Sequence, residues 1–280
     1  MIRTLCLSLL LVASTVTFAH ATDTPRIISI GGAITETLFA IGGGENIVGA
    51  DTTSYYPADA NRLPKVGYQR TLAAEGVLSL GPTHLIGTEE AGPLATIEQL
   101  KNTGISIELL NAPRDIEGIV DNVLKIGKLV EREQAAQKLA DEIRQKQTGL
   151  ENRVTAKPID QKIIFVMTHG AKTPMTAGTG TSAHAVLEII GAGNSVTGFS
   201  GYKPLTAEAM VQMKPDVILT THRSIAQLGG LDQFLALPGL SLTPAGQNKQ
   251  IIAMDGLRLL GFGPRTIDAA SDLYDRLNKL

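Results

Sequence analysis

Tyr68 has the most distinctive chemistry in this sequence of 280 residues. It follows Val66 and Gly67 in a loop that precedes an expected helix from Ala73 to Leu80. A deprotonated phenol is a hard oxygen ligand, so it suits a hard cation such as ferric iron. Coordination and a neighbouring positive charge would both favour the phenolate. The same position is also typical of an ordinary half-buried loop tyrosine, so the spacing alone leaves both interpretations open.

Two histidines could supply a further ligand. His169 follows an expected strand that ends at Met167, and His222 stands beside Arg223 after another. Imidazole is a common iron ligand, so His169 could complete a second axial position or serve a second ligand molecule; the alternative is a loop histidine without a role. The histidines beyond residue 21 are dispersed, whereas a zinc or manganese carrier needs several ligands at tight spacing.

Short apolar runs alternate with helical segments, and these elements must position the candidate residues. Strands separated by helices are typical of parallel sheets with crossover helices, and such sheets bind ligands beyond the carboxyl ends of their strands. The expected helices in the first part of the chain are Ile34 to Ile41, Ala73 to Leu80 and Thr96 to Thr103. The expected strands are Arg26 to Ile30, Ile47 to Ala50, Thr83 to Ile86, Ile107 to Leu110, Lys162 to Met167 and Val217 to Thr220.

The segment 115–157 differs because it contains almost no strand signal. Asp115 can cap its start, an apolar stripe runs from Ile119 to Val130, and the remainder is charged and alanine-rich. As one helix, about forty residues would reach ~60 Å, long enough to join two lobes. We therefore expect an N-terminal α/β lobe over 22–114, a connecting helical segment over 115–157 and a C-terminal α/β lobe over 158–280.

The two expected lobes share a faint repeat. A tyrosine precedes each copy, at Tyr68 and Tyr202, and a glutamate stands at the head of a helix in each, at Glu75 and Glu208. A carboxylate there compensates the helix dipole, which is one explanation for the pair. At a constant offset of 133 residues, Leu72, Ala74, Glu75 and Pro82 recur as Leu205, Ala207, Glu208 and Pro215.

Residues 1–21 read as a signal peptide rather than part of the fold. Arg3 precedes an apolar run, Leu5 to Phe18, that is too short to span a bilayer as a mature helix, and cleavage is expected after Ala21. The single cysteine, Cys6, would leave with this segment, and its place before the apolar run argues against a lipoprotein anchor. These features predict an exported, thiol-free protein in a bacterial periplasm.

Composition and motifs argue against several classes of function. The 25 basic and 27 acidic residues form no long run of one sign, so we expect neither nucleic-acid binding nor membrane insertion. The sequence lacks a Gly-x-Ser-x-Gly nucleophile elbow and the lysine motif of a phosphate-binding loop, and a glycine-containing segment from Gly191 to Val196 lacks the last glycine of a dinucleotide fingerprint. We therefore expect that the protein is not an enzyme.

Three segments carry a resemblance to a known class. The opening Arg26-Ile-Ile-Ser-Ile-Gly-Gly-Ala-Ile-Thr-Glu-Thr-Leu resembles the start of periplasmic binding proteins with a helical backbone, which serve importers of haem, cobalamin and ferric siderophores. Val66-Gly-Tyr followed by Leu72-Ala-Ala-Glu-Gly-Val-Leu-Ser-Leu, and Leu259-Leu-Gly-Phe-Gly-Pro-Arg-Thr, are similar to the haem-binding branch. The resemblance implies two Rossmann-like lobes with parallel sheets, joined by one long α-helix, and a ligand cleft between them.

The resemblance also implies roles for individual residues. Tyr68 would be the haem iron ligand, with His169 as a possible second axial ligand, and Arg223 would stabilise the phenolate, with Arg70 as a competing candidate. Glu75 and Glu208 resemble the paired glutamates that dock this class onto arginines of the permease. Basic residues that could meet the haem propionates are Lys203, Arg258 and Arg265. Apolar residues that could line the cleft are Met167, Met175, Phe199, Leu259 and Phe262.

The function that this resemblance implies is transport. A monomeric periplasmic protein would receive ferric haem from an outer-membrane receptor and deliver it to the permease dimer of an ABC importer with its ATPase. Haem would be the transported ligand rather than a catalytic cofactor. The alternative is cobalamin or a ferric siderophore, whose carriers share the fold; the absence of tryptophan and the presence of Tyr68 favour haem.

Overall fold

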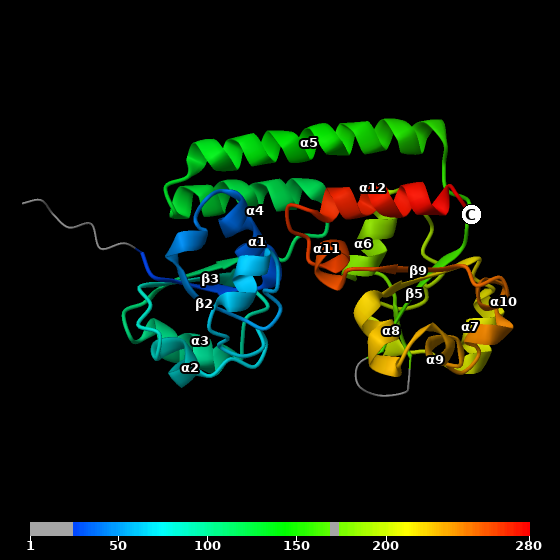
Figure 1. The fold of residues 1–280 in the computed structure, drawn as a ribbon, viewed down its shortest axis with the longest axis horizontal. Coiled ribbons are helices and arrows are strands. Elements are labelled where there is room, and N and C mark those ends of the chain that lie inside the picture. Colours follow the sequence, from blue (N-terminus) through cyan, green and yellow to red (C-terminus); the bar gives the residue numbers. More distant parts are fainter. Residues whose placement is uncertain (1–24, 169–173) are drawn as a thin grey trace, which may run out of the picture.

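The computed structural model describes residues 25–168 and 174–280, which form two α/β lobes beneath a layer of helices (Figure 1). The α/β class and the two-lobe architecture that the sequence predicts are confirmed. The expected signal peptide, residues 1–21, and the candidate ligand His169 lie outside the described residues.

The N-terminal lobe is built on a four-stranded parallel sheet of order β2-β1-β3-β4. The strand from Ile27 to Ile30, inside this sheet, is buried throughout because both faces are covered: Ile27 packs towards the helical layer, and Ile28 and Ile30 pack towards α2 and α3. The four strands that the sequence predicts here are confirmed. They are β1 (Ile27–Ile30), β2 (Ile47–Ala50), β3 (His84–Thr88) and β4 (Ser106–Leu110). The helices are α1 (Gly32–Ala40), α2 (Ala74–Leu78) and α3 (Leu94–Lys101), with 3-10 turns at Gly44–Asn46 and Ala58–Arg62.

The C-terminal lobe contains a mixed five-stranded sheet of order β7-β6-β5-β8-β9. Its parallel part is β5 (Ile163–Met167), β8 (Val217–Thr221) and β9 (Ile251–Met254). The prediction of parallel sheets alone is wrong here, since β6 (Met175–Ala177) runs antiparallel to both β5 and β7 (Tyr202–Pro204). Too few residues separate β5 from β6 for a crossover helix, so the chain must turn back.

Among the described residues, seven helices complete this lobe and its connection to the rest of the molecule. They are α6 (Ser182–Ile189), α7 (Ala207–Met213), α8 (His222–Leu228), α9 (Leu231–Leu235), α10 (Pro244–Gln247), α11 (Gly256–Leu260) and α12 (Thr266–Leu277), with a 3-10 turn at Leu240–Leu242. None of the helices within the described residues is long and apolar enough to cross a membrane.

The connecting segment is two antiparallel helices, α4 (Ile116–Leu129) and α5 (Glu133–Ala156), rather than one uninterrupted helix. Asp115 caps α4 as expected, accepting from the backbone N–H of Gly118 at 2.7 Å. The chain then reverses through Glu131, whose φ is 54°, while Arg132 N–H donates to the Gly127 carbonyl at 2.7 Å. An added Cβ on Gly127 would collide with Ala136, so glycine lets the two helices approach closely.

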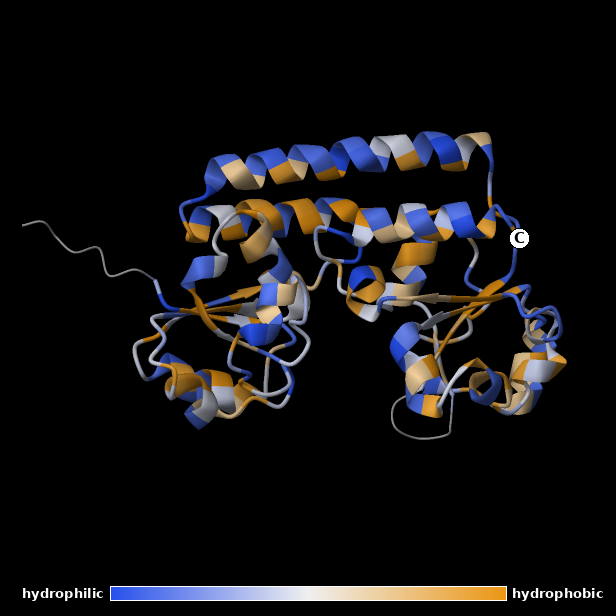
Figure 2. Cartoon of the chain, viewed as in Figure 1, coloured by the Kyte–Doolittle hydropathy of each residue, from blue (hydrophilic) through white to orange (hydrophobic). Residues whose placement is uncertain are grey.

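Of the two helices, α5 is the one that runs over both lobes (Figure 1). Its 24 residues span ~36 Å and run above both lobes, with α4 and α12 roughly end to end beneath it (Figure 1). Lys146 pairs with Asp268 at 2.9 Å, and the Tyr274 hydroxyl donates to the Arg153 and Lys157 carbonyls. Figure 2 shows mainly hydrophilic residues along α5 and hydrophobic residues concentrated on the strands and on α4.

A buried ion pair also connects the lobes. Glu36 on α1 is only 4% exposed and accepts from the Arg265 Nη2 at 2.7 Å and from the Arg265 backbone N–H at 3.0 Å. The Arg265 guanidinium lies 3.3 Å from the centroid of the Tyr56 ring. Because Arg265 lies between α11 and α12, this contact fixes the C-terminal segment against the N-terminal lobe.

We predict that Glu36→Gln lowers the free energy of unfolding by about 2 to 4 kcal/mol, because Arg265 would remain largely buried without its counterion. Urea unfolding monitored by circular dichroism measures the change. Glu117→Gln is the matched control, since Glu117 pairs with Arg144 on the exposed surface and should change stability little. Equal effects of the two substitutions would contradict the prediction.

Candidate ligand-binding site

The loop that carries Tyr68 lies at the carboxyl edge of the N-terminal sheet. The Gly67 carbonyl accepts from Thr52 N–H at 2.9 Å, and the Gln69 carbonyl accepts from Gly92 N–H at 2.9 Å. The loop is therefore held between the residues after β2 and those after β3. Gly67 has a φ of 103°, which favours glycine at this turn. The ring of Tyr68 remains 38% exposed.

A buried carboxylate organises the base of this edge. Asp51 is fully buried and accepts from Gly31 N–H at 2.9 Å, Thr53 N–H at 2.9 Å, Thr53 Oγ1 at 2.7 Å and Ser54 Oγ at 2.7 Å. Lys65 Nζ donates to the Ser54 carbonyl at 2.6 Å; burial lowers the pKa of Lys65, and the charge of Asp51 acts in the opposite direction. These bonds fix the segments that follow β1 and β2. The Tyr68 loop is hydrogen-bonded to the segment after β2 through Thr52.

Tyr55, in the segment that follows β2, contacts the other lobe. Its hydroxyl accepts from Leu257 N–H at 2.7 Å and donates to Asp255 Oδ2 at 3.2 Å. Burial raises the pKa of Tyr55 to about 12, with the carboxylate of Asp255 acting in the same direction. The carboxyl end of β9 thus touches the N-terminal lobe.

Arg70 places a positive charge beside the hydroxyl of Tyr68. Its Nη1 donates to the Tyr68 hydroxyl at 2.8 Å, and its Nη2 donates to Glu90 Oε2 at 2.5 Å. The second carboxylate oxygen of Glu90 lies 3.6 Å from Arg114 Nη2. Partial burial lowers the pKa of Arg70, but Glu90 and Tyr68 raise it, and the net direction is upward. The guanidinium on the tyrosine hydroxyl is thus that of Arg70, the competing candidate, and not that of Arg223.

Tyr202 brings a second phenol from the other lobe. Its ring is 38% exposed, the same fraction as that of Tyr68. Burial raises the pKa of Tyr202, while the charge of Arg114 lowers it and that of Glu90 raises it. Arg114 and Glu90 follow strands of the N-terminal sheet, so the pKa of Tyr202 depends on charges from the other lobe. We define the candidate site as Tyr68, Arg70, Glu90, Arg114 and Tyr202.

Other residues proposed from the sequence lie near this region without touching Tyr68 in the described part of the chain. Arg223 and His222 begin α8 at the carboxyl end of β8 and are exposed. Lys203 adjoins Tyr202, with its ammonium 4.9 Å from the centroid of the Phe199 ring. Met167, Met175 and Phe199 are partly exposed, as a ligand-contacting wall requires.

Four predictions about the C-terminal segment are corrected by the structure. Arg265 binds Glu36, and Arg258 binds Asp272 at 3.4 Å and the Asp268 carbonyl at 3.1 Å. Both guanidinium groups thus serve packing between helices and lobes rather than propionate binding. Leu259 and Phe262 are buried core residues and not cleft walls.

Glu90 and Arg114 were not identified as site residues from the sequence. Glu90 follows β3 and Arg114 follows β4, so both occupy the edge where parallel sheets bind ligands. Applying that rule to every charged residue just beyond a strand would have found both.

Glu75 and Glu208 are exposed in the first turns of α2 and α7, on the side of the molecule away from α5 (Figure 1). The repeat is confirmed at the level of elements. The helix α2 begins at Ala74 and α7 at Ala207, and the following strands begin at His84 and Val217, so the offset of 133 residues is preserved.

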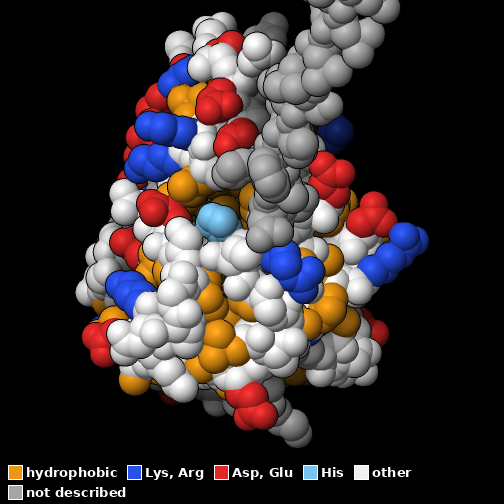
Figure 3. Space-filling view, turned by 90° about the vertical axis from the view of Figure 1, so that its left-hand side faces the viewer, with side chains coloured by type: hydrophobic (Ala, Val, Ile, Leu, Met, Phe, Trp, Pro, Cys, Tyr) orange, Lys and Arg blue, Asp and Glu red, His pale blue; other side chains and the backbone are white. Residues whose placement is uncertain are grey.

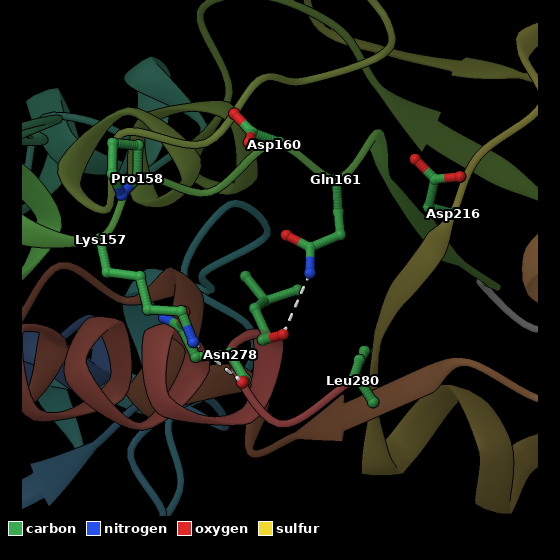
Figure 4. Close-up of a pocket in the computed structure, with 8 residues that line it drawn as sticks. Lys157, Pro158, Asp160, Gln161, Asp216, Asn278 and Leu280 are labelled. Carbon is green, nitrogen blue, oxygen red and sulfur yellow. Dashed lines mark hydrogen bonds between the residues drawn. The ribbon is translucent and has the colours of Figure 1, made fainter.

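A shallow depression of about 420 Å³ lies elsewhere, near the C-terminus (Figure 4). Asp216 and Gln161 line it just before β8 and β5, which is the amino edge of the sheet and the wrong edge for ligands of this architecture. Gln161 donates to the Leu277 carbonyl at 3.1 Å and Lys157 to the Asn278 carbonyl at 3.5 Å. Its polar groups therefore attach the end of α12 to neighbouring segments.

Surface charge and metal ligands add two observations. Figure 3 shows the end of the molecule formed by the N-terminal lobe, where acidic and basic side chains lie among hydrophobic patches. Within residues 25–168 and 174–280, no three His, Cys, Asp or Glu side chains cluster in a way that could hold a metal ion.

Comparison with known proteins identifies the family. Residues 27–256 match the family described as periplasmic binding protein. The chain belongs to this family. Its curated relatives include an uncharacterized ABC transporter substrate-binding lipoprotein of Bacillus subtilis strain 168, 24% identical over 90% of this chain and 79% of the relative. They also include a vitamin B12-binding protein of Vibrio campbellii, 24% identical over 82% of each chain.

The periplasmic binding protein fold is also found in solved structures similar to this chain. The periplasmic heme-binding protein BhuT, in complex with two hemes, is 38% identical and has a TM-score of 0.86, with 91% of this chain and 98% of that chain covered. The family and its members are substrate-binding proteins of ABC transporters, so the prediction that the chain is not an enzyme is confirmed.

We predict that Tyr55 contributes to stability in a pH-dependent way. Its pKa is higher in the folded than in the unfolded state, so this stability is fully present below about pH 10 and is lost as pH rises through about 12. Over a third of Tyr55 is exposed, and we therefore expect a loss of about 1 kcal/mol rather than the ~2.7 kcal/mol of a fully buried group. Urea unfolding between pH 9 and about pH 11 should show a smaller decline in Tyr55→Phe; an identical decline would refute the prediction.

Proposed function

We propose that this periplasmic binding protein captures ferric haem and delivers it to the permease of an ABC importer, with Tyr68 as the iron ligand. The observation that carries the proposal is the Arg70 guanidinium, 2.8 Å from the Tyr68 hydroxyl, at the carboxyl edge of the sheet. A guanidinium stabilises a phenolate, and a phenolate is a suitable axial ligand for ferric haem iron. The rigid attachment of the loop keeps both groups in position before a ligand arrives.

The relatives support haem as the ligand class. BhuT is named a heme-binding protein and is more similar in sequence than the relatives named for vitamin B12. Its two hemes also support the proposal that His169 supplies a second axial position or serves a second haem. Arg114, Lys203 and Arg223 are the remaining basic residues on or beside the site that would meet propionates.

The wider transport pathway follows from the same proposal. Residues 1–21 would direct export to the periplasm and be removed after Ala21. The mature protein, a monomer with lobes over 22–114 and 158–280 and a helical connection over 115–157, would receive haem from an outer-membrane receptor. The permease dimer and its ATPase would accept the ligand from it.

Cobalamin is the second candidate ligand. The observation in its favour is the group of curated relatives named vitamin B12-binding protein, such as that of Vibrio campbellii. A neutral corrin edge with amide side chains makes no special use of a phenol paired with arginine, so the candidate site favours haem. Ferric siderophores share the fold class and are tested by the same competition.

Titration of the mature protein with hemin tests the ligand and its coordination together. We expect a phenolate-type ferric spectrum that Tyr68→Phe abolishes, with affinity reduced about tenfold or more by loss of the iron bond. Tyr56→Phe is the matched control, because Tyr56 is 40% exposed, close to the 38% of Tyr68, and lies outside the candidate site. Tight binding of cyanocobalamin with no hemin spectrum, or a phenolate spectrum retained in Tyr68→Phe, would overturn the proposal.

Docking onto the permease is proposed for Glu75 and Glu208. Each is exposed in the first turn of a helix, one per lobe, and their elements repeat across the two lobes. A two-fold permease presents matching surfaces, so a repeated pair of carboxylates suits recognition by one arginine from each subunit. Helix-dipole compensation alone would not require the pair to match.

We predict that Glu75→Lys combined with Glu208→Lys abolishes haem uptake by the reconstituted importer, because charge reversal replaces attraction to the permease by repulsion. Hemin affinity should stay within about twofold, because both substitutions leave Tyr68 and Arg70 in place. Glu142→Lys with Glu151→Lys, which changes the same charge on exposed positions of α5, is the control and should transport normally. Loss of hemin binding in the first double variant would contradict the docking role.

A further inference from the structure

We infer that Glu90 is a positioning residue of the ligand site, which holds Arg70 so that its guanidinium stays on the Tyr68 hydroxyl. The inference rests on the proposed function, because it assigns the purpose of this contact to the phenolate ligand. It concerns a residue that touches neither the iron nor the tyrosine and acts through Arg70 alone.

The guanidinium of Arg70 bonds both Tyr68 and Glu90. One nitrogen of Arg70 donates to Tyr68 at 2.8 Å while another donates to Glu90 at 2.5 Å, so the planar group bridges two oxygens. The Arg70 side chain is 53% exposed, whereas that of Glu90 is 30% exposed. Two bonds in one plane leave the guanidinium much less rotational freedom than one bond would.

Backbone hydrogen bonds on both sides of Glu90 fix the position of this residue. Glu89 N–H donates to the Leu110 carbonyl at 2.8 Å, and Ala91 N–H donates to the Thr88 carbonyl at 2.9 Å. Glu90 therefore extends from the ordered carboxyl end of β3. A carboxylate fixed in this way can hold the more exposed Arg70 side chain in one orientation.

Arg114 fixes the other side of the carboxylate. Its Nη2 lies 3.6 Å from Glu90 Oε1, and its guanidinium carbon lies 5.9 Å from the centroid of the buried Phe262 ring. Glu90 is thus held between an arginine before α4 and the arginine on the Tyr68 loop. The carboxylate also separates two positive groups that would otherwise repel each other.

Charge alone offers a competing role for Glu90, because it partly neutralises Arg70 and so opposes phenolate formation. Two substitutions separate the roles. Glu90→Gln keeps an oxygen acceptor for Arg70 and removes the charge, whereas Glu90→Ala removes both. The charged groups that face Glu90 in the described residues are Arg70 and Arg114, with the phenols of Tyr68 and Tyr202 beyond them.

The test compares hemin binding by the wild type, Glu90→Ala, Glu90→Gln, Arg70→Ala and the double variant Arg70→Ala/Glu90→Ala. We expect Glu90→Ala to weaken hemin binding about fivefold and to move the phenolate-to-iron absorption band to its position in Arg70→Ala. Glu90→Gln should stay within about twofold of the wild type, and the double variant should lose no more than Arg70→Ala. Glu89→Ala is the matched control, because its carboxylate accepts from Ala112 N–H at 3.0 Å instead.

Three results would overturn the inference: a wild-type band in Glu90→Ala, additive losses in the double variant, or equal losses in Glu90→Gln and Glu90→Ala. Tyr68→Phe in the same series separates this failure from that of the proposed function. A phenolate band that persists in Tyr68→Phe refutes the ligand assignment and the Glu90 role with it. A band lost in Tyr68→Phe and unchanged in Glu90→Ala refutes the Glu90 role alone.

Discussion

The buried pair of Glu36 and Arg265 sets the constraint under which a two-lobe site can exist. The candidate site takes Tyr68 and Arg70 from one lobe and Tyr202 from the other, so its geometry depends on how the lobes are held. The Glu36 side chain is only 4% exposed. Moving the two charges apart would leave a buried charge without its counterion, which is costly, so the pair restricts motion of one lobe relative to the other. Tyr55 adds a second contact at the end of β9, and α5 with α12 spans the opposite side. Lobe closure through a wide angle would break all three connections, and we therefore expect ligand binding to be accompanied by small motions.

The alternation of strands and helices in the N-terminal lobe was predictable from the sequence, because short apolar runs and glycine or proline residues mark several of its elements locally, such as Gly31 after β1 and Pro93 before α3. The break between α4 and α5 was not readable. The turn at Glu131 contains neither glycine nor proline, and good helix formers stand on both sides of it. What closes α4 is the approach of Ala136 to Gly127, a tertiary contact that no local pattern reports. The short strands β6 and β7 were missed for a related reason, since three residues carry too little periodicity.

In the candidate site, too, local features were predictable from the sequence and tertiary contacts were not. Tyr68 was found because phenol chemistry and the family motif are local, and Arg70 was considered because it is two residues away. Arg265 was misassigned because its partner, Glu36, is 229 residues distant, and no local pattern reports a contact over that separation. The repeat also fails at the point where the ligand would bind. Its elements match at an offset of 133 residues, but Tyr68 lies on a loop and Tyr202 in a strand, one residue out of step. The lobes thus keep their common framework and differ in the residues that face the ligand.

Charge balance links the site to the proposed ligand. Arg70, Arg114 and Glu90 together leave one net positive charge beside a neutral Tyr68, and ionisation of the phenol brings the group to neutrality. Ferric haem brings a metal centre that attracts the phenolate and two propionates that attract arginine. A neutral ligand would bring no carboxylate to these guanidinium groups, and burying them beneath it would cost desolvation without new partners. An anionic metalloporphyrin supplies what this arrangement lacks, a cation for the oxygen of Tyr68 and carboxylates for the surrounding basic residues, and for this reason we place haem ahead of cobalamin.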